Sequence, residues 1–253
     1  MKVAQAGLLT LGVALSGLAQ ADLVALKGDI SYWAYDGHAE MSNTDPRTKE
    51  KLDNDGAVQL SVALEHPVPI IPNAKIRYVN LDTKTKNNFA GQPAYSVNLD
   101  HADFILYYEI LDNVVDLDIG AGATTLNGDI SNYANQRVDI DETYPIIYAT
   151  VGGKLPFTGL SAKAEMTYSN FDDAQLTDAL AEIQYNFIDN MLVDVGLKAG
   201  YRIFTVDLDD YSRNDIKLEF KGPYIGFQIK HSSLTRSFSS FTLSKTALFF
   251  FFS

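Results

Sequence analysis

The sequence predicts an all-β protein, an up-and-down antiparallel transmembrane β-barrel of about ten strands. Three observations predict it: apolar and polar residues alternate with period two in ten segments, short and long connections alternate between these segments, and several segments are long. No interior apolar run reaches the ~18 residues that a membrane-spanning helix needs. The sequence therefore excludes a helical membrane bundle.

The first residues have the features of a cleaved export signal. Lys2 supplies a positive charge, residues 3–18 are mostly apolar, and Ala19-Gln20-Ala21 has the small residues that a signal peptidase accepts. We therefore expect residues 1–21 to be a signal peptide that is cleaved after Ala21. The alternative is an N-terminal membrane anchor, which the short apolar stretch disfavours.

Each predicted strand places apolar side chains on one face and charged side chains on the other. The first strand, near residues 24–35, has Lys27 and Asp29 on its polar face. In residues 144–155 the pattern indicates a strand but leaves its facing open. The remaining predicted strands are residues 58–65, 74–78, 97–111, 114–125, 160–166, 178–187, 193–202 and 216–220, the last segment continuing to residue 231.

The connections between the predicted strands alternate in length. Tight turns at one end of a sheet and longer polar loops at the other describe an up-and-down arrangement. An even number of strands lets such a sheet close, so that no unpaired edge remains in lipid. The short connections are residues 66–71, 112–113, 156–159 and 189–190, and the long ones are 36–55, 82–94, 126–142, 171–175 and 207–214.

The barrel domain is predicted to cover residues 22–231. His231 stands where the last strand of such barrels commonly ends in an aromatic residue, and residues 232–253 lose the alternation and end in a run of phenylalanines. We expect this atypical C-terminal tail to be an extension or a reading-frame artefact that membrane assembly does not need. An eleventh strand or a lipid-contacting tail are the alternatives.

Strand length and aromatic placement favour a membrane barrel over a soluble one. Residues 97–111 and 114–125 exceed the ~5–6 residues usual in soluble strands. In a membrane barrel the apolar face meets lipid and the polar face lines the lumen, whereas a soluble barrel does the reverse. Aromatic side chains near the strand ends are predicted to form two interface girdles: Tyr32, Trp33, Tyr35, Phe157, Tyr168, Phe171, Phe187, Tyr211 and Phe227.

Four segments carry a resemblance to a known group. Trp33 and residues 107–113 (YYEILDN), 155–160 (LPFTGL) and 222–227 (GPYIGF) resemble a family of uncharacterised outer-membrane β-barrel proteins of Gram-negative bacteria. The resemblance covers about residues 22–230. It implies a barrel in the cell outer membrane, in contact with lipid and lipopolysaccharide and inserted by the barrel assembly machinery. It implies no catalytic residues, and we expect a monomer.

Charged side chains on the polar faces are predicted to fill the lumen. A ten-stranded barrel is narrow, so opposite charges inside it should pair, because an unpaired buried charge is costly. We expect a salt-bridged plug, with an ion or small-solute channel as the alternative. The predicted lumen network consists of Lys75, Arg77, Asp103, Glu109, Asp116, Asp118, Lys163, Glu165, Glu182, Asp194, Lys198, Arg202, Lys217 and Glu219.

Two kinds of hydrolase are the catalytic alternatives. A surface protease would activate water with paired carboxylates and a histidine, and a lipid esterase would need a serine, a histidine and an acid. No spacing in the chain is diagnostic of either. The nearest candidates are Asp207, Asp209, Asp210 and His38 for the protease, and Ser96, His101 and Asp103 for the esterase.

Composition and loop chemistry exclude further classes. The 253 residues contain no cysteine, which removes disulfides, cysteine-ligated metals and thiol catalysis. A formal net charge of -12 argues against a nucleic-acid partner. The acidic segments 139–142 and 207–210 lack the spacing of a calcium loop, so we expect neither metal nor cofactor. A structural or surface-interaction role is the first hypothesis, a narrow pore the second and a barrel hydrolase the third.

Overall fold

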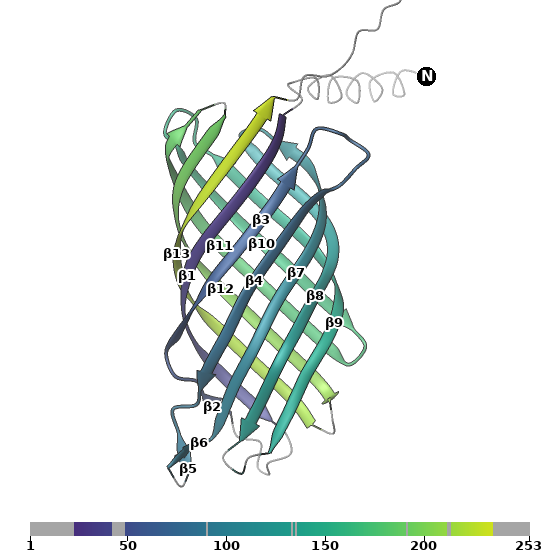
Figure 1. The fold of residues 1–253 in the computed structure, drawn as a ribbon, viewed down its shortest axis with the longest axis vertical. Coiled ribbons are helices and arrows are strands. Elements are labelled where there is room, and N and C mark those ends of the chain that lie inside the picture. The colour runs from purple at the N-terminus through teal and green to yellow at the C-terminus, as the bar shows by residue number, and fades with distance from the viewer. Residues whose placement is uncertain are drawn as a thin grey trace, which may run out of the picture.

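Ten antiparallel strands close into a barrel in the computed structural model (Figure 1). The model describes residues 23–41, 49–89, 91–132, 134, 136–190, 192–211 and 214–234. Each barrel strand pairs with the next one along the chain, and β13 pairs with β1. The predicted fold is confirmed. The barrel strands are β1 (Leu23–Met41), β3 (Asp55–Glu65), β4 (Asn73–Lys84), β7 (Tyr95–Asp112), β8 (Val115–Asn132), β9 (Arg137–Lys154), β10 (Leu160–Phe171), β11 (Ala174–Asp189), β12 (Val193–Tyr211) and β13 (Asn214–Leu234).

Short additional strands lie in the long connections, at the end of the barrel opposite the short turns. They are β2 (Glu50–Lys51) and the hairpin of β5 (Asn88–Phe89) and β6 (Gln92–Pro93). Among the residues that the model describes, no helix is long and apolar enough to cross a membrane.

The last strand is longer than predicted. It continues past residue 231 because Ser232, Ser233 and Leu234 pair with the first residues of β1. The predicted signal peptide and residues 235–253 of the predicted tail lie outside the described residues, and both assignments stay predictions.

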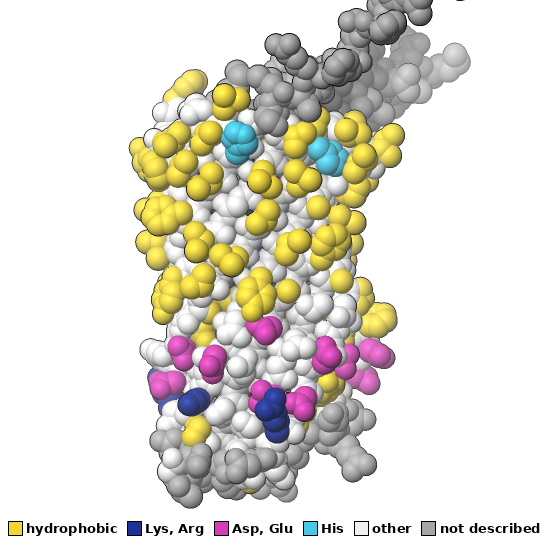
Figure 2. Space-filling model, viewed as in Figure 1, with side chains coloured by type: hydrophobic (Ala, Val, Ile, Leu, Met, Phe, Trp, Pro, Cys, Tyr) yellow, Lys and Arg dark blue, Asp and Glu magenta, His cyan; other side chains and the backbone are white. Residues whose placement is uncertain are grey.

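The outer surface of the barrel has two zones along its axis (Figure 2). Next to the short turns the exposed side chains are apolar, as at Ile30, Leu60, Phe104, Ile183 and Ile225. We call this region the apolar zone; the region towards the long loops, where charged side chains are exposed, is the polar zone. Exposed aliphatic side chains around a closed barrel are the surface that lipid requires, so the barrel spans a membrane through its apolar zone.

Inside the barrel the arrangement is the opposite: side chains are charged at the level of the apolar zone and hydrophobic at the level of the polar zone. Strand β12 is a simple example. Inward-facing Lys198 and Arg202 lie at the level of the apolar zone, and inward-facing Phe204 and Val206 lie at the level of the polar zone. Strands of 18 to 21 residues, such as β7 and β13, are longer than the ~9–11 residues that cross a bilayer. The extra length forms a continuation with a dry core and a wet exterior, as in a soluble barrel.

This change of surroundings corrects two predicted lumen residues, Lys217 and Glu219. Both lie on the outside of β13, because the buried face there is Ile216, Leu218 and Phe220. Lys217 forms an ion pair with Asp207 on the outer surface. The Lys221 ammonium, 2.6 Å from Glu219, holds the pKa of that carboxyl below its usual value. The expectation failed because polar side chains face inward only where lipid surrounds the barrel.

Two predicted girdle residues also lie elsewhere. Tyr32 is exposed on the outside, and adjacent residues on a strand face opposite sides, so Trp33 and Tyr35 point into the barrel and are buried. The Trp33 indole Nε1 donates a hydrogen bond to the Gly222 carbonyl at 3.1 Å. Four other predicted girdle residues are exposed: Phe157, Phe171, Phe187 and Phe227. The remaining two, Tyr168 and Tyr211, are partly exposed.

A paired arginine substitution on β11 tests the boundary between the two zones. Ile183 and Thr177 both face outward, the first in the apolar zone and the second in the polar zone. We expect Ile183→Arg to lower the free energy of unfolding in phospholipid vesicles by about 2–4 kcal/mol, because the guanidinium enters hydrocarbon. Thr177→Arg should change it by less than about 0.5 kcal/mol. Denaturant titration measures both, and equal effects would contradict the zones.

Candidate functional site: the charged bore

The centre of the bore holds three cations and three carboxylates, all buried. They come from five strands, β4, β7, β10, β11 and β12, whose inward faces meet at one level. Opposite charges in a water-poor space must be matched, because each unpaired ion there costs several kcal/mol. We call this group the ion layer: Lys75, Arg77, Asp103, Glu165, Asp178 and Arg202.

Arg77 joins the three carboxylates of the ion layer. Its Nε donates to an Asp103 carboxylate oxygen at 2.9 Å, and its two terminal nitrogens lie 3.0 Å from Glu165 and 2.8 Å from Asp178. The Lys75 ammonium binds both oxygens of Glu165 at 2.7 Å. The planar guanidinium holds five N–H donors in a fixed fork, so one arginine can bind three carboxylates at once.

Arg202 closes the ion layer on the side of the long loops. Its Nε and one terminal nitrogen bind the two oxygens of Asp178 at 2.9 and 2.8 Å, and the other terminal nitrogen donates to the Gln59 side-chain oxygen. The guanidinium carbon lies 4.7 Å from the centre of the Trp33 ring. Arg202 therefore binds Asp178 in the ion layer and also packs against the Trp33 ring on the side of the hydrophobic residues.

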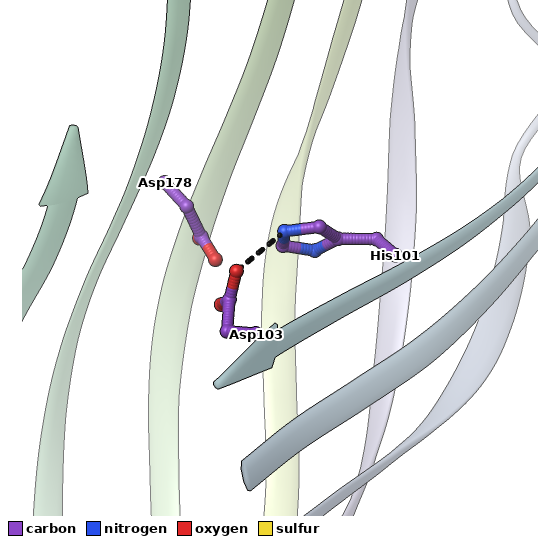
Figure 3. A group of neighbouring side chains, drawn as sticks. All are labelled: His101, Asp103 and Asp178. Carbon is purple, nitrogen blue, oxygen red and sulfur yellow. Dashed lines mark ion pairs between the residues drawn. The ribbon is translucent and has the colours of Figure 1, made fainter. Parts of the chain in front are cut away.

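His101, Asp103 and Asp178 form a compact group beside the arginines (Figure 3). His101 Nε2 lies 3.1 Å from Asp103 Oδ1, and Nδ1 lies 3.3 Å from an Arg202 terminal nitrogen. A guanidinium only donates, so Nδ1 accepts from Arg202. Nε2 also lies 3.0 Å from the Thr124 hydroxyl. The ring stacks on Phe204 with 4.2 Å between centroids.

The same three side chains are a possible metal-ligand set, since their ligand atoms lie within 4.8 Å of one another. Both carboxylates, however, are already bound by the guanidinium groups of Arg77 and Arg202. A divalent cation would have to displace two fixed positive charges, which Coulomb repulsion opposes. The two carboxylates therefore belong to the ion layer, and His101 packs beside them.

A second set of ion pairs lies next to the ion layer, towards the short turns. Lys163 is 3.1 Å from Glu182, and Lys198 lies between Asp29 at 3.0 Å and Glu182 at 3.5 Å. The Tyr224 hydroxyl donates to Glu182 at 2.6 Å. Positive and negative charges are balanced at this level as well.

The bore widens at the short turns into a cavity of about 690 Å³, which we call the acidic mouth. Lys154 pairs there with Asp116 at 3.2 Å and with Asp112 at 3.5 Å. The predicted lumen residues Glu109, Asp116, Asp118 and Asp194 line this cavity. The predicted plug thus has an open vestibule on one side, which sequence reasoning did not anticipate.

The opposite end of the bore is filled by hydrophobic side chains. Buried residues from every barrel strand except β10 pack into one cluster at the level of the polar zone. We call it the apolar core; it includes Leu81, Leu99, Leu126, Phe204 and Phe220, each at most 1% exposed. Among the described residues, aliphatic and aromatic side chains pack closely in this part of the barrel.

The candidate hydrolase residues are not brought together among the described residues. Ser96 lies on the outward face of β7, whereas His101 and Asp103 point inward. His38 pairs in register with Glu219 of β13, and Asp207 on β12 pairs with Lys217, so a strand separates them. Asp139, in the acidic segment 139–142, is bound by Arg137 at 2.7 Å.

The predicted lumen network did not include several residues that have partners in the charged bore. These residues lie on correctly predicted strands, at alternate positions that face the lumen. Their place in the alternation is the sequence signal that could have identified them. Their pairing depends on which strands meet across the lumen, which period-two alternation does not report. The missed residues are Asp29, Gln59, Glu65, Asp178 and Tyr224.

Comparison with known proteins gives similarity in architecture only. No family model and no curated protein matches the sequence, so membership of one barrel family stays a prediction. The outer membrane protease OmpT from Escherichia coli has 9% identity and a TM-score of 0.39, over 83% of this chain and 97% of that one. The translocator domain of the autotransporter NalP from Neisseria meningitidis has 10% identity and a TM-score of 0.42, over 90% and 95%. Ail of Yersinia pestis has 11% identity and a TM-score of 0.36, over 81% and 97%.

Removing one member of the ion layer should be far more costly than breaking a surface pair. Arg202→Met leaves Asp178 buried with less compensation, and we expect a loss of about 3–5 kcal/mol in the free energy of unfolding. Lys217→Met, which breaks the outer pair with Asp207, should cost less than about 1 kcal/mol. Denaturant titration in detergent micelles compares the two, and similar losses would contradict a structural ion layer.

Proposed function

We propose that this protein is an outer-membrane barrel that is closed to solutes and has a structural or surface-interaction role. The apolar core carries this proposal, because it fills the bore at the level where the barrel rises out of the membrane. The ion layer closes the bore a second time within the membrane. A barrel whose bore is closed at two levels is suited to a structural role in the membrane or to interactions through its outer surface.

The two zones support an orientation for the barrel. In outer-membrane barrels the short turns face the periplasm and the long loops face outward. In this orientation the polar zone stands above the outer leaflet and presents its charged exterior, including Lys84, Asp139 and Lys217, to the surroundings. Lipid and lipopolysaccharide are the expected neighbours, and export followed by insertion by the barrel assembly machinery is the expected route.

The structure favours this role over the two alternatives. A pore needs a continuous hydrated path, and the apolar core interrupts it. A hydrolase needs a nucleophile or an activated water beside an acid and a base. His101 is held between Arg202 and Asp103 as part of the packing, with Ser96 on the other face of its strand. We therefore propose a non-catalytic barrel.

Electrical recording tests closure directly. The purified protein inserted into a planar lipid bilayer is expected to show no steady conductance. Arg202→Ser, which weakens the ion layer and leaves the apolar core, should also stay silent. A steady open level in the unmodified protein would contradict the proposal and favour the narrow pore.

A further inference from the structure

We propose that the acidic mouth docks an extended basic polypeptide segment of a periplasmic partner, with apolar side chains next to its lysines or arginines. The direction from which the partner arrives rests on the proposed orientation, with the short turns in the periplasm. The docking chemistry itself rests on the charge, shape and rim of the cavity.

The acidic mouth has more carboxyl groups than lysines in its lining. Seven carboxylates and four lysines line it. The lysines already have partners: Lys154 binds two of the lining aspartates, Lys163 binds Glu182, and Lys27 and Lys230 lie near Glu65, 2.5 and 4.0 Å away. Four lining carboxylates have no ion pair with a described residue: Glu109, Asp118, Asp189 and Asp194.

These four carboxylates are arranged as two cross-strand pairs. Glu109 is directly opposite Asp118 across β7 and β8, and Asp189 is directly opposite Asp194 across β11 and β12. Like charges directly opposite each other destabilise a sheet. β9 and β10 separate the two pairs, so they stand on different walls of the same cavity. A chain carrying several cations would relieve the repulsion on both walls.

The rim of the cavity carries apolar side chains beside polar ones such as Asp112, Lys154 and Thr158. Leu111, Leu155, Phe157 and Leu160 line the acidic mouth and are exposed. Phe157 is fully exposed at the tip of its turn and has φ of 65°, a left-handed conformation that non-glycine residues seldom adopt. A bare metal ion or a small polyamine would satisfy the walls and leave this rim uncovered. Acidic walls beside apolar side chains at the rim fit a peptide that alternates basic and apolar side chains.

The size of the cavity agrees with a short peptide segment. A volume of about 690 Å³ is within the range of about 300–1,000 Å³ found for ligand pockets. The ion pair of Lys163 and Glu182 lines the cavity, and Lys198 lies behind it, 3.5 Å from Glu182. The segment therefore docks in a blind vestibule and does not thread the barrel.

Fluorescence anisotropy tests the proposal on the full-length protein in phospholipid nanodiscs. The probe is a labelled peptide of alternating lysine and leucine, and the comparison peptides alternate lysine with serine and glutamate with leucine. We expect the lysine–leucine peptide to bind tightest, with an affinity that falls as salt is raised. Glu109→Gln with Asp118→Asn should weaken it at least about fivefold, as expected for two lost charge contacts in a partly desolvated site.

Matched variants separate docking from general attraction. Phe157→Ser should weaken the lysine–leucine peptide and leave the lysine–serine peptide unchanged. Asp53→Asn with Asp55→Asn removes two carboxylates at the far end of the barrel and should have no effect. Retained heat-modifiable gel mobility shows that each variant is folded.

Three results would overturn the proposal. These are equal binding by the mouth variants and the unmodified protein, equal binding by empty nanodiscs, or equal affinity for the lysine–leucine and lysine–serine peptides. The outcome is independent of conductance: a barrel that conducts would refute the proposed closure and leave the docking result standing.

Discussion

The need to neutralise buried charge governs the inside of this barrel. Ten strands enclose a bore so narrow that side chains fill it, and at its centre these side chains are ionic. Such groups are tolerated only when each carboxylate meets a cation at hydrogen-bond distance. Arg77 and Arg202 meet this requirement with planar guanidinium groups that bind several oxygens each. The resulting network joins five strands across the lumen.

Between the ion layer and the long loops, the same strands place hydrophobic side chains inside the barrel and polar ones outside. Once the barrel leaves the membrane its exterior meets water, so polar side chains move outside and hydrophobic ones inside without any change in strand facing. On β12 the exchange falls between Arg202 and Phe204 inside, and between Ile203 and Thr205 outside. The contact of Arg202 with both Asp178 and Trp33 lies at this junction, and it links the ionic and apolar parts of the interior.

Period-two alternation predicted most of the fold. It located all ten barrel strands and the inward facing of residues such as Lys75, Arg77 and Glu165, because lipid outside demands apolar side chains on one face. It misplaced Lys217 and Glu219, because polar and apolar residues alternate in the same way in both zones. In the apolar zone the polar face points into the barrel, whereas in the polar zone it points outward. Trp33 and Tyr35 were placed in the girdle because they are aromatic and lie near a strand end, although alternation from Tyr32 puts both of them on the opposite face.

The alternation of polar and apolar residues could not predict which side chains contact each other inside the bore. Gln59 on β3 meets Arg202 on β12 only because β13 and β1 pair and close the barrel. Asp178 meets Arg202 from the neighbouring strand β11, which depends on the strand register. The acidic mouth likewise arises from residues far apart in the chain, such as Glu109 and Asp194. Alternation assigns a face to each residue, and cross-lumen distances follow only when the barrel is closed.

Accessibility scanning along β12 tests the exchange of faces most directly, and the absence of native cysteines makes single labels unambiguous. Spin labels at Leu197→Cys, Ile203→Cys, Thr205→Cys and Asp207→Cys would be measured with oxygen and a water-soluble nickel complex in lipid vesicles. The account expects oxygen to dominate at the first two positions and nickel at the last two. Nickel access at Ile203, or oxygen-dominated access at Asp207, would contradict it.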